Sequence, residues 1–226
     1  MRPAAFVLLH AAGDGAWNWH LVATELFRGG HDVVAVDLPA DDESAGLREY
    51  ADAVVHDIGD RKNLVVVGHS FGAFTAPLVC ERVPVELLVL LAPMIPKPGE
   101  SPMDWWTNSG QTQAQGDAGT GGMGDTETYY HDVPPELATE ATRRDRNHPS
   151  DRAYREPWPL DAWPEVPTRV LLGTNDRLLP AAWMRRLARD RLGVTADEID
   201  SGHCVNLSRP RELAERLEAY WADITA

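Results

Sequence analysis

Three polar residues, Ser70, Asp176 and His203, have the types and the spacing that nucleophilic catalysis requires. Ser70 lies between Gly68 and Gly72 in a G-x-S-x-G pattern. A serine hydroxyl is a weak nucleophile at neutral pH, so it needs a base within hydrogen-bond reach, and that base needs an acceptor that fixes its tautomer. His203 fits the role of the base and Asp176 the role of the acceptor, and the nucleophile comes first in the chain.

The residues around Ser70 predict a sharp turn from a strand into a helix. An apolar run, 64–67, precedes the turn, and the small residues Ala73 and Ala76 follow it. Glycine is needed on both sides of the serine because side chains there would collide with the neighbouring backbones. Such a turn lifts the hydroxyl clear of the sheet and aims the backbone N–H of Phe71 at the group under attack. An ordinary turn is the alternative, since glycine and serine are common turn residues.

The acid and the histidine both have competing interpretations. Asp176 closes the loop 173–176 and is alternatively a turn former, because Asn-Asp pairs are favoured in turns. Asp200 is nearer to His203 in sequence, but it precedes the histidine by only three residues at a strand end and has little freedom to face the imidazole. His203 is alternatively a structural histidine. We favour the catalytic interpretation because Asp176 and His203 each follow a predicted strand.

These residues need a scaffold, and the hydrophobic pattern predicts a three-layer α/β fold with a mostly parallel sheet. Apolar strands alternate with amphipathic helices, and the run at 87–91 is continuously apolar, as in buried parallel strands. The carboxyl ends of parallel strands meet at one edge, which brings the three polar residues together. The expected strands are 6–9, 33–36, the apolar run that starts at 64 and stops at Ser70, 87–91, 168–173 and one near Ile199. The expected helices include 47–58 and 181–192, with Pro77 interrupting the helix after Ser70.

The alternation stops between Pro93 and Pro167, which divides the chain into a core, 1–92 and 168–226, and an inserted lid, 93–167. Residues 110–124 look nearly featureless, but aromatic residues flank them. A long loop segment inside a compact domain is usually a lid, a binding loop or disordered, and aromatic residues favour the lid. Packing of the lid onto the core is the alternative role for these side chains. The expected substrate contacts are Trp105, Trp106, Tyr129, Tyr130 and His131.

Composition narrows the partners. The 226 residues carry 35 acidic and 21 basic side chains, a formal charge of −14, so we do not expect nucleic acid to bind. Cys80 and Cys204 are expected to be free thiols in a reducing compartment. The apolar run 4–9 is too short for a signal sequence or a membrane span, and we expect a cytoplasmic protein with no membrane partner. The sequence does not indicate the oligomeric state.

Cofactor and metal motifs have little support. Gly13-Asp14-Gly15 follows a strand and Asp37 comes about twenty residues later, as in a dinucleotide-binding fingerprint. Asn18 stands where the third glycine should be, and tryptophans crowd the start of the helix. No H-E-x-x-H, Cys-x-x-Cys or P-loop pattern occurs, so no cofactor and no metal are expected.

The whole pattern resembles α/β-hydrolases of the plant methylesterase and hydroxynitrile lyase type, with their bacterial esterase relatives. The resemblance covers nearly the whole chain apart from the insertion. The matching stretches are 6–12, 15–19 with its Trp-x-Trp, 36–39, 68–72, 173–176 and 202–203. The resemblance implies an α/β-hydrolase fold and an oxyanion hole made by the N–H groups of Ala12 and Phe71. His10-Ala11 departs from the usual His-Gly of the esterases.

The two chemistries of this family differ at two positions. The lyases resemble the chain but have a threonine after the loop histidine and a lysine after the catalytic histidine, where this chain has Ala11 and Cys204. A methyl group cannot hydrogen-bond a cyanohydrin, and a neutral thiol cannot stabilise a departing anion. We therefore predict a serine hydrolase that cleaves a small carboxylic ester or thioester through an acyl-enzyme. The alternatives are a non-catalytic ligand receptor on this fold and a hydroxynitrile lyase.

Overall fold

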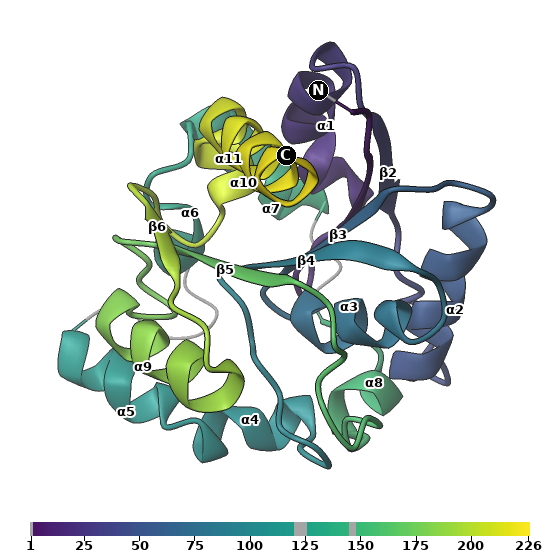
Figure 1. The fold of residues 1–226 in the computed structure, drawn as a ribbon. Coiled ribbons are helices and arrows are strands. Elements are labelled where there is room, and N and C mark those ends of the chain that lie inside the picture. Colours follow the sequence, from purple (N-terminus) through teal and green to yellow (C-terminus); the bar gives the residue numbers. More distant parts are fainter. Residues whose placement is uncertain (1, 120–125, 145–147) are drawn as a thin grey trace.

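The chain forms a six-stranded sheet in the order β2-β1-β3-β4-β5-β6, in which every paired strand is parallel (Figure 1). A computed structural model describes residues 2–119, 126–144 and 148–226. The strands are β1 (Ala5–Leu9), β2 (Asp32–Val36), β3 (Leu64–His69), β4 (Val85–Leu91), β5 (Thr168–Gly173) and β6 (Asp197–Ile199). All six lie where the apolar runs predict them.

Helices cover both faces of this sheet, because successive side chains of each strand point to opposite faces. In β3, Val65 and Val67 join one core and Val66 joins the other. The first core is closed by α1 (His20–Arg28) and α11 (Pro210–Thr225), and the second by α2 (Leu47–Ile58), α3 (Gly72–Cys80) and α9 (Ala181–Leu192) (Figure 1). The predicted three-layer α/β fold is confirmed. Two short helices, η1 (Ala16–Trp19) and α10 (Val205–Ser208), follow β1 and β6.

The helix after Ser70 does not stop at Pro77, and that prediction was wrong. α3 runs through the proline to Cys80, and all of its residues up to Val79 are buried. Proline removes one backbone donor and crowds one carbonyl, a cost of about 3 kcal/mol in a helix interior. Burial of the helix between the sheet and α2 offsets that cost, because α3 is apolar on all sides apart from Thr75 and is stable only when it is buried all round.

The described part of the segment between β4 and β5 contains several helices. It contains α4 (Pro102–Asn108), α5 (Gln111–Ala118), α6 (Thr126–Tyr130), α7 (Pro135–Arg144) and α8 (Asp151–Arg155). The stretch 110–124 was expected to be nearly featureless, yet its first part forms α5; residues 120–125 lie outside the described ranges. Gly110 and Gly119 flank α5 in the left-handed region, with φ of 74° and 66°.

Polar contacts fasten the insertion to the core at several separate points. The indole N–H of Trp158 donates to the carbonyl of Phe74 at 2.9 Å, and the Gln111 amide donates to the carbonyl of Leu178 at 2.6 Å. The Tyr50 hydroxyl lies 3.1 Å from the hydroxyl of Ser150. The side chain of Arg191 on α9, which is 5% exposed, forms an ion pair with Glu100 at 2.5 Å. The insertion is therefore held on the second core rather than tethered only by its two ends.

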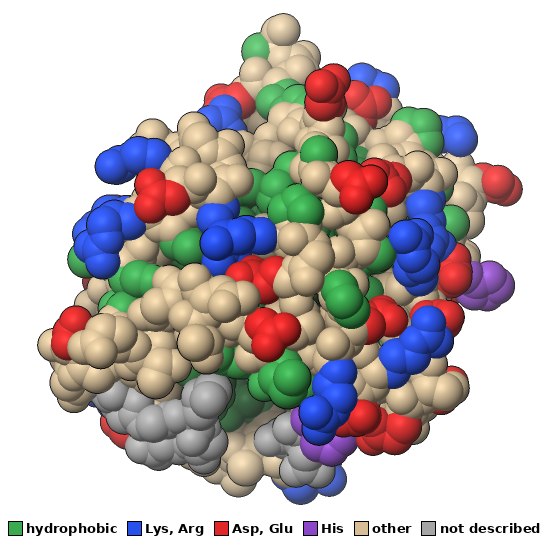
Figure 2. Space-filling model, turned by 90° about the horizontal axis from the view of Figure 1, so that it is seen from below, with side chains coloured by type: hydrophobic (Ala, Val, Ile, Leu, Met, Phe, Trp, Pro, Cys, Tyr) green, Lys and Arg blue, Asp and Glu red, His purple; other side chains and the backbone are tan. Residues whose placement is uncertain are grey.

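The surface mixes charges of both signs. On the part of the face in Figure 2 that the structure describes, blue and red side chains are interspersed, and no extended patch of one sign covers it. Within the described ranges, no helix is both long and apolar enough to cross a bilayer.

Candidate active site

Ser70 sits on a strained turn between β3 and α3. Its φ is +50°, a left-handed conformation that costs a non-glycine residue roughly 1–3 kcal/mol. A Cβ at Gly68 would lie 2.8 Å from the Gly72 carbonyl oxygen, and one at Gly72 would lie 2.9 Å from the carbonyl oxygens of Leu9 and His10. Both distances are too short for any side chain, so the two glycines are what allow this turn to form against β1.

His203 and Asp176 meet beside this turn. The Nδ1 atom of His203 lies 2.8 Å from Oδ2 of Asp176, and both side chains are almost fully buried. The other carboxylate oxygen, Oδ1, accepts the backbone N–H groups of Leu178 and Leu179 at 2.8 and 2.9 Å. An aspartate oxygen in this position accepts the Nδ1 proton, which leaves Nε2 of the neutral ring as an acceptor.

Asp200, the competing acid, does not face the imidazole. It lies on the surface, where its Oδ1 accepts the side-chain amide of Asn175 at 2.6 Å. The loops after β5 and β6 pack so closely that a Cβ at Gly173 would lie 2.5 Å from the carbonyl oxygens of Ser201 and Gly202. This contact brings the loop that carries Asp176 against the loop that carries His203.

A contact from the insertion supports the loop that carries His203, and no sequence pattern predicts it. Oδ2 of Asp132 accepts the backbone N–H of Gly202 at 2.8 Å and the Ser201 hydroxyl at 3.2 Å. His131, next to it, pairs its Nε2 atom with the carbonyl of Asn175 at 3.0 Å. The two consecutive residues therefore hold the loops after β5 and β6 together from above the sheet edge.

Two further buried histidines brace the site without lining its cavity. His10 donates from Nδ1 to the carbonyl of Ala11 at 2.8 Å, and its Nε2 accepts the N–H of Leu38 at 3.1 Å. His69 donates from Nε2 to the carbonyl of His203 at 3.0 Å. Burial lowers the pKa of His69 well below its ordinary value, and the nearby His203 adds to the shift. Both residues thus fix the paths of loops beside Ser70.

The two residues expected to form the oxyanion hole, Ala12 and Phe71, come from the loop after β1 and from the start of α3. Ala12 lines the cavity from the loop after β1. Phe71 is the N-cap residue of α3, directly before Gly72, so its N–H lies at the amino end of that nine-residue helix. Free N–H groups and the helix dipole both favour negative charge at such an end.

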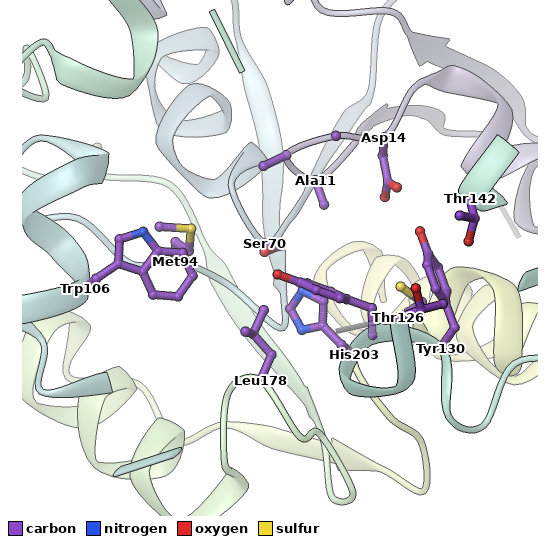
Figure 3. Close-up of a pocket in the computed structure, with 14 residues that line it drawn as sticks. Ala11, Asp14, Ser70, Met94, Trp106, Thr126, Tyr130, Thr142, Leu178 and His203 are labelled. Atoms are coloured by element: carbon purple, nitrogen blue, oxygen red, sulfur yellow. The ribbon is translucent and has the colours of Figure 1, made fainter. Parts of the chain in front are cut away.

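A cavity of about 210 Å³ opens onto Ser70 and His203. It is lined by Ala11, Ala12, Gly13, Asp14, Ser70, Met94, Trp106, Thr126, Tyr129, Tyr130, Thr142, Leu178, His203 and Cys204. Figure 3 shows Ser70 and His203 near the middle of the labelled side chains, with Trp106, Met94 and Leu178 on one side and Thr126, Tyr130 and Thr142 on the other. The cavity therefore extends in two directions from the serine.

Three of the five predicted substrate contacts, Trp106, Tyr129 and Tyr130, line this cavity. Trp105 does not, because it is fully buried and its indole N–H donates to the carbonyl of Ile95 at 2.8 Å. His131 does not line it either, since its ring is turned to Asn175. For Trp105 the structure supports the packing alternative, and His131 braces loops instead of facing the cavity.

No sequence pattern marks several of the lining residues, among them Met94, Thr126, Thr142 and Leu178. These residues come from loops and helices far apart in the chain and share no pattern. Asp14 also lines the cavity. In the sequence it stands out only as part of Gly13-Asp14-Gly15, the incomplete dinucleotide-binding pattern. Cys204 lines the cavity as a buried thiol, and burial raises its pKa well above the ordinary value, with Asp14 the next contributor.

The acid of that dinucleotide motif has a structural role. Oδ1 of Asp37 accepts the backbone N–H of Ala16 at 2.8 Å, and a Cβ at Gly15 would lie 2.9 Å from the same oxygen. Asp37 thus binds a backbone N–H at the start of η1. The dinucleotide-binding hypothesis would instead require Asp37 to bind a ribose hydroxyl. Among the residues that the structure describes, no group of three or more His, Cys, Asp or Glu side chains is arranged to hold a metal ion.

Comparison with known proteins agrees with this architecture. The family model described as "Alpha/beta hydrolase family" matches residues 6–216. The chain belongs to this family. A probable esterase, PIR7A, from Oryza sativa subsp. indica is 36% identical over 109 residues, which are 42% of this chain and 41% of the rice protein. An alpha-hydroxynitrile lyase from Arabidopsis thaliana is 24% identical over 98% of both chains.

The fold also matches solved structures. The crystal structure of polyneuridine aldehyde esterase superposes with a TM-score of 0.80 at 21% identity, covering 97% of this chain and 99% of that chain. At this identity the match shows the fold alone. The chain spans about two fifths of the length of several curated relatives that it matches, and those relatives include both esterases and a synthase.

Proposed function

We propose that this alpha/beta hydrolase is a serine hydrolase that cleaves small carboxylic esters or thioesters. The observation that carries the proposal is the 2.8 Å contact between His203 and Asp176 beside a cavity that Ser70 also lines. A serine, an imidazole and a carboxylate in this order supply a nucleophile, a general base and a group that holds the base in one tautomer. The esterases among the relatives support an ester as the substrate.

The proposed reaction begins when His203 takes the Ser70 proton on Nε2 as the serine oxygen bonds to the substrate carbonyl carbon. The N–H groups of Ala12 and Phe71 stabilise the oxyanion that forms. The tetrahedral intermediate collapses, the bond to the leaving group breaks, and the His203 proton passes to the departing alkoxide or thiolate. Water then attacks the acyl-enzyme, gives a proton to His203, and releases the carboxylic acid as Ser70 regains its proton.

Helices α4 to α8 would act as the lid in this proposal. Trp106 from α4 and the two tyrosines of α6 face the cavity from the insertion. Their rings offer flat apolar surface with a few polar groups, which suits an uncharged ester better than a charged one. Removal of water by such a cover would strengthen every electrostatic interaction at the serine.

Cyanohydrin cleavage is the second candidate, because a full-length relative is a hydroxynitrile lyase. The side chains at the two discriminating positions argue against it. Ala11 offers no hydroxyl, and Cys204 is a buried thiol whose raised pKa keeps it neutral. Neither group would stabilise a leaving cyanide, so we retain ester hydrolysis.

A non-catalytic ligand receptor on this fold is the other alternative. Such a receptor would need no general base, so the His203–Asp176 contact favours an enzyme.

The test is hydrolysis of a panel of esters that vary the acyl and alcohol parts separately, with mandelonitrile as the lyase substrate. We expect turnover of 4-nitrophenyl acetate and no cyanide release. Ser70→Ala should reduce hydrolysis to the level left by binding and the oxyanion hole, about 10³- to 10⁴-fold above water.

A fluorophosphonate probe should label the wild-type protein at Ser70 and leave Ser70→Ala unlabelled. Thermal unfolding of both proteins serves as the folding control. Near-native turnover by Ser70→Ala would refute the mechanism, and cyanide release without ester turnover would refute the substrate class.

A further inference from the structure

A short piece of the insertion, at the end of α6 and just after it, contacts both loops that carry the acid and the base. The Tyr129 ring stands at 74° to the His203 ring, with 5.9 Å between the two centroids. The Nε2 atom of His131 lies 3.0 Å from the carbonyl oxygen of Asn175, in the loop after β5. The loops of the acid and the base therefore share one neighbour from a distant part of the chain.

Asp132 makes the most direct contact with the loop of the base. Its Oδ2 atom accepts the backbone N–H of Gly202 at 2.8 Å and the hydroxyl of Ser201 at 3.2 Å. Arg209, between α10 and α11, places a cationic nitrogen 3.8 Å from the same oxygen. Because Gly202 directly precedes His203, one oxygen of the insertion fixes the backbone that leads into the base.

The close fit between the insertion and this loop depends on glycine. A Cβ at Gly202 would lie 2.6 Å from Oδ1 of Asp132 and 2.6 Å from Nε2 of His131. Both side chains thus pack directly on the backbone of Gly202. A displacement of either one is passed to the next residue of the loop, which is the base.

Apolar packing keeps this part of the insertion on the loop. Val133 and Ala141 share a buried cluster with Cys204 and Leu207, which follow the base in the chain. Asp132 is not among the described residues that line the cavity. A change at Asp132 should therefore act through the loop that it holds and not by removing a substrate contact.

We propose that Asp132 is a positioning residue for the general base. By holding the Gly202 N–H and the Ser201 hydroxyl, it sets the direction in which the His203 ring presents Nε2 to Ser70. The insertion then contributes to the chemical steps and is more than a cover for the substrate. This inference rests on the proposed function, because His203 is the base of that reaction.

The experiment uses two acetate esters whose leaving groups differ in their need for a proton. Ethoxide must receive the proton that His203 holds, whereas 4-nitrophenolate leaves without protonation. A displaced imidazole therefore slows ethyl acetate more than 4-nitrophenyl acetate. A smaller fraction of folded enzyme slows both esters by the same factor. We would measure kcat, KM and thermal unfolding for the wild type, Asp132→Ala, Asp132→Asn and Asp117→Ala.

We expect Asp132→Ala to lower kcat/KM for ethyl acetate about tenfold to a hundredfold, the scale of a misplacement of about 1 Å. The fall for 4-nitrophenyl acetate should be smaller. Asp132→Asn should keep most of the activity, because its amide oxygen can accept the same two hydrogen bonds. Asp117→Ala is the matched control, since Asp117 is an exposed acid of the insertion that accepts the Gln113 amide within α5. It should match the wild type with both esters.

Three results would overturn the inference. Asp132→Ala could match the wild type, it could slow both esters by one factor that follows the loss of folded protein, or Asp132→Asn could be as slow as Asp132→Ala. If Asp132→Ala does not fold, Ser201→Ala supplies the comparison, because it removes one hydrogen bond and leaves the one from Gly202. An equal fall for both esters in Ser201→Ala would also count against the inference.

Failure of the proposed function gives a different result. The wild type would then hydrolyse no ester, and the fluorophosphonate probe would not label Ser70. In that case the serine hydrolase assignment fails, and the role of Asp132 fails with it.

Discussion

Replacement of Asp176 by asparagine is expected to change the tautomer of His203 while the fold around the imidazole stays the same. Oδ1 of Asp176 accepts the two backbone N–H groups of Leu178 and Leu179 at 2.8 and 2.9 Å. An amide nitrogen at that position would face two donors, so the asparagine oxygen must occupy it. The amide NH₂ group then replaces Oδ2 and faces Nδ1 of His203, which lies 2.8 Å from Oδ2 in the native protein.

That orientation reverses the hydrogen bond to the imidazole. The NH₂ group donates to Nδ1, so the ring proton moves to Nε2, and Nε2 can no longer take the Ser70 proton. Loss of the correct tautomer with intact geometry costs about 10⁴-fold in kcat in the serine protease template. This factor corresponds to about 5.4 kcal/mol in the activation free energy, at 1.36 kcal/mol for each factor of ten. We expect Asp176→Asn to show a loss of that order.

The assay is kcat for 4-nitrophenyl acetate, with thermal unfolding of each protein as the control for folding. Asp200→Asn is the matched variant, because it makes the same chemical change at the exposed acid closest to His203 in sequence. Its Oδ1 atom can still accept the Asn175 amide, and we expect kcat to stay within about threefold of the wild type, the range of a typical surface substitution. The reasoning fails if Asp176→Asn keeps more than a tenth of the activity or matches Asp200→Asn.

Three further predictions concern the supports of the site. Gly202→Ala should lower both kcat and the melting temperature, because the new Cβ would lie 2.6 Å from Oδ1 of Asp132. The control is Gly116→Ala on α5, where a Cβ meets no atom within 4 Å. It should raise the free energy of unfolding in urea by about 0.5–1 kcal/mol. Burial lowers the folded-state pKa of His69, so the unfolded state binds more protons below about pH 6.5. The wild type should therefore lose about 1 kcal/mol more than His69→Gln between pH 6.5 and 5.5, and equal losses would contradict this. Iodoacetamide should leave Cys204 unmodified in the native protein at pH 8.5, because its pKa is raised and it is buried; mass spectrometry showing rapid alkylation there would count against the closed packing of the site.

The strands and the outer helices could be predicted from the sequence because their residues report on purely local requirements. The 3.6-residue period of apolar side chains marks α2 over Leu47–Ile58 to the residue, and Gly193, with φ of 67°, ends α9 where the pattern places it. Gly68 and Gly72 likewise report a close approach of backbones that no other residue would permit. Local steric limits and the periodicity of apolar side chains depend only on residues that are near one another in sequence, so they can be predicted without the tertiary structure.

The insertion was harder to predict because its helices are stabilised by contacts with distant residues. α5 carries glutamines and a glycine rather than an apolar face, and its Gln111 is buried by a hydrogen bond to Leu178. Trp105 and Trp106 are adjacent in sequence, yet one is in the core and the other lines the cavity. Which side of a helix meets the core and which meets a cavity depends on where the helix is docked, and that is a tertiary property.

For the site itself, the sequence by itself predicted that the serine, the acid and the histidine come together, because their types fit nucleophilic catalysis and strand ends of a parallel sheet meet at one edge. Only the tertiary structure decided that Asp132 supports the Gly202 loop and that Asp14 lines the cavity. Both are aspartates in loops, where a carboxylate serves equally well as a cap, a turn former or a ligand. Their roles depend on which backbone N–H or open space lies within about 3 Å in the folded chain, the reach of a hydrogen bond, and that distance is set by residues tens of positions away.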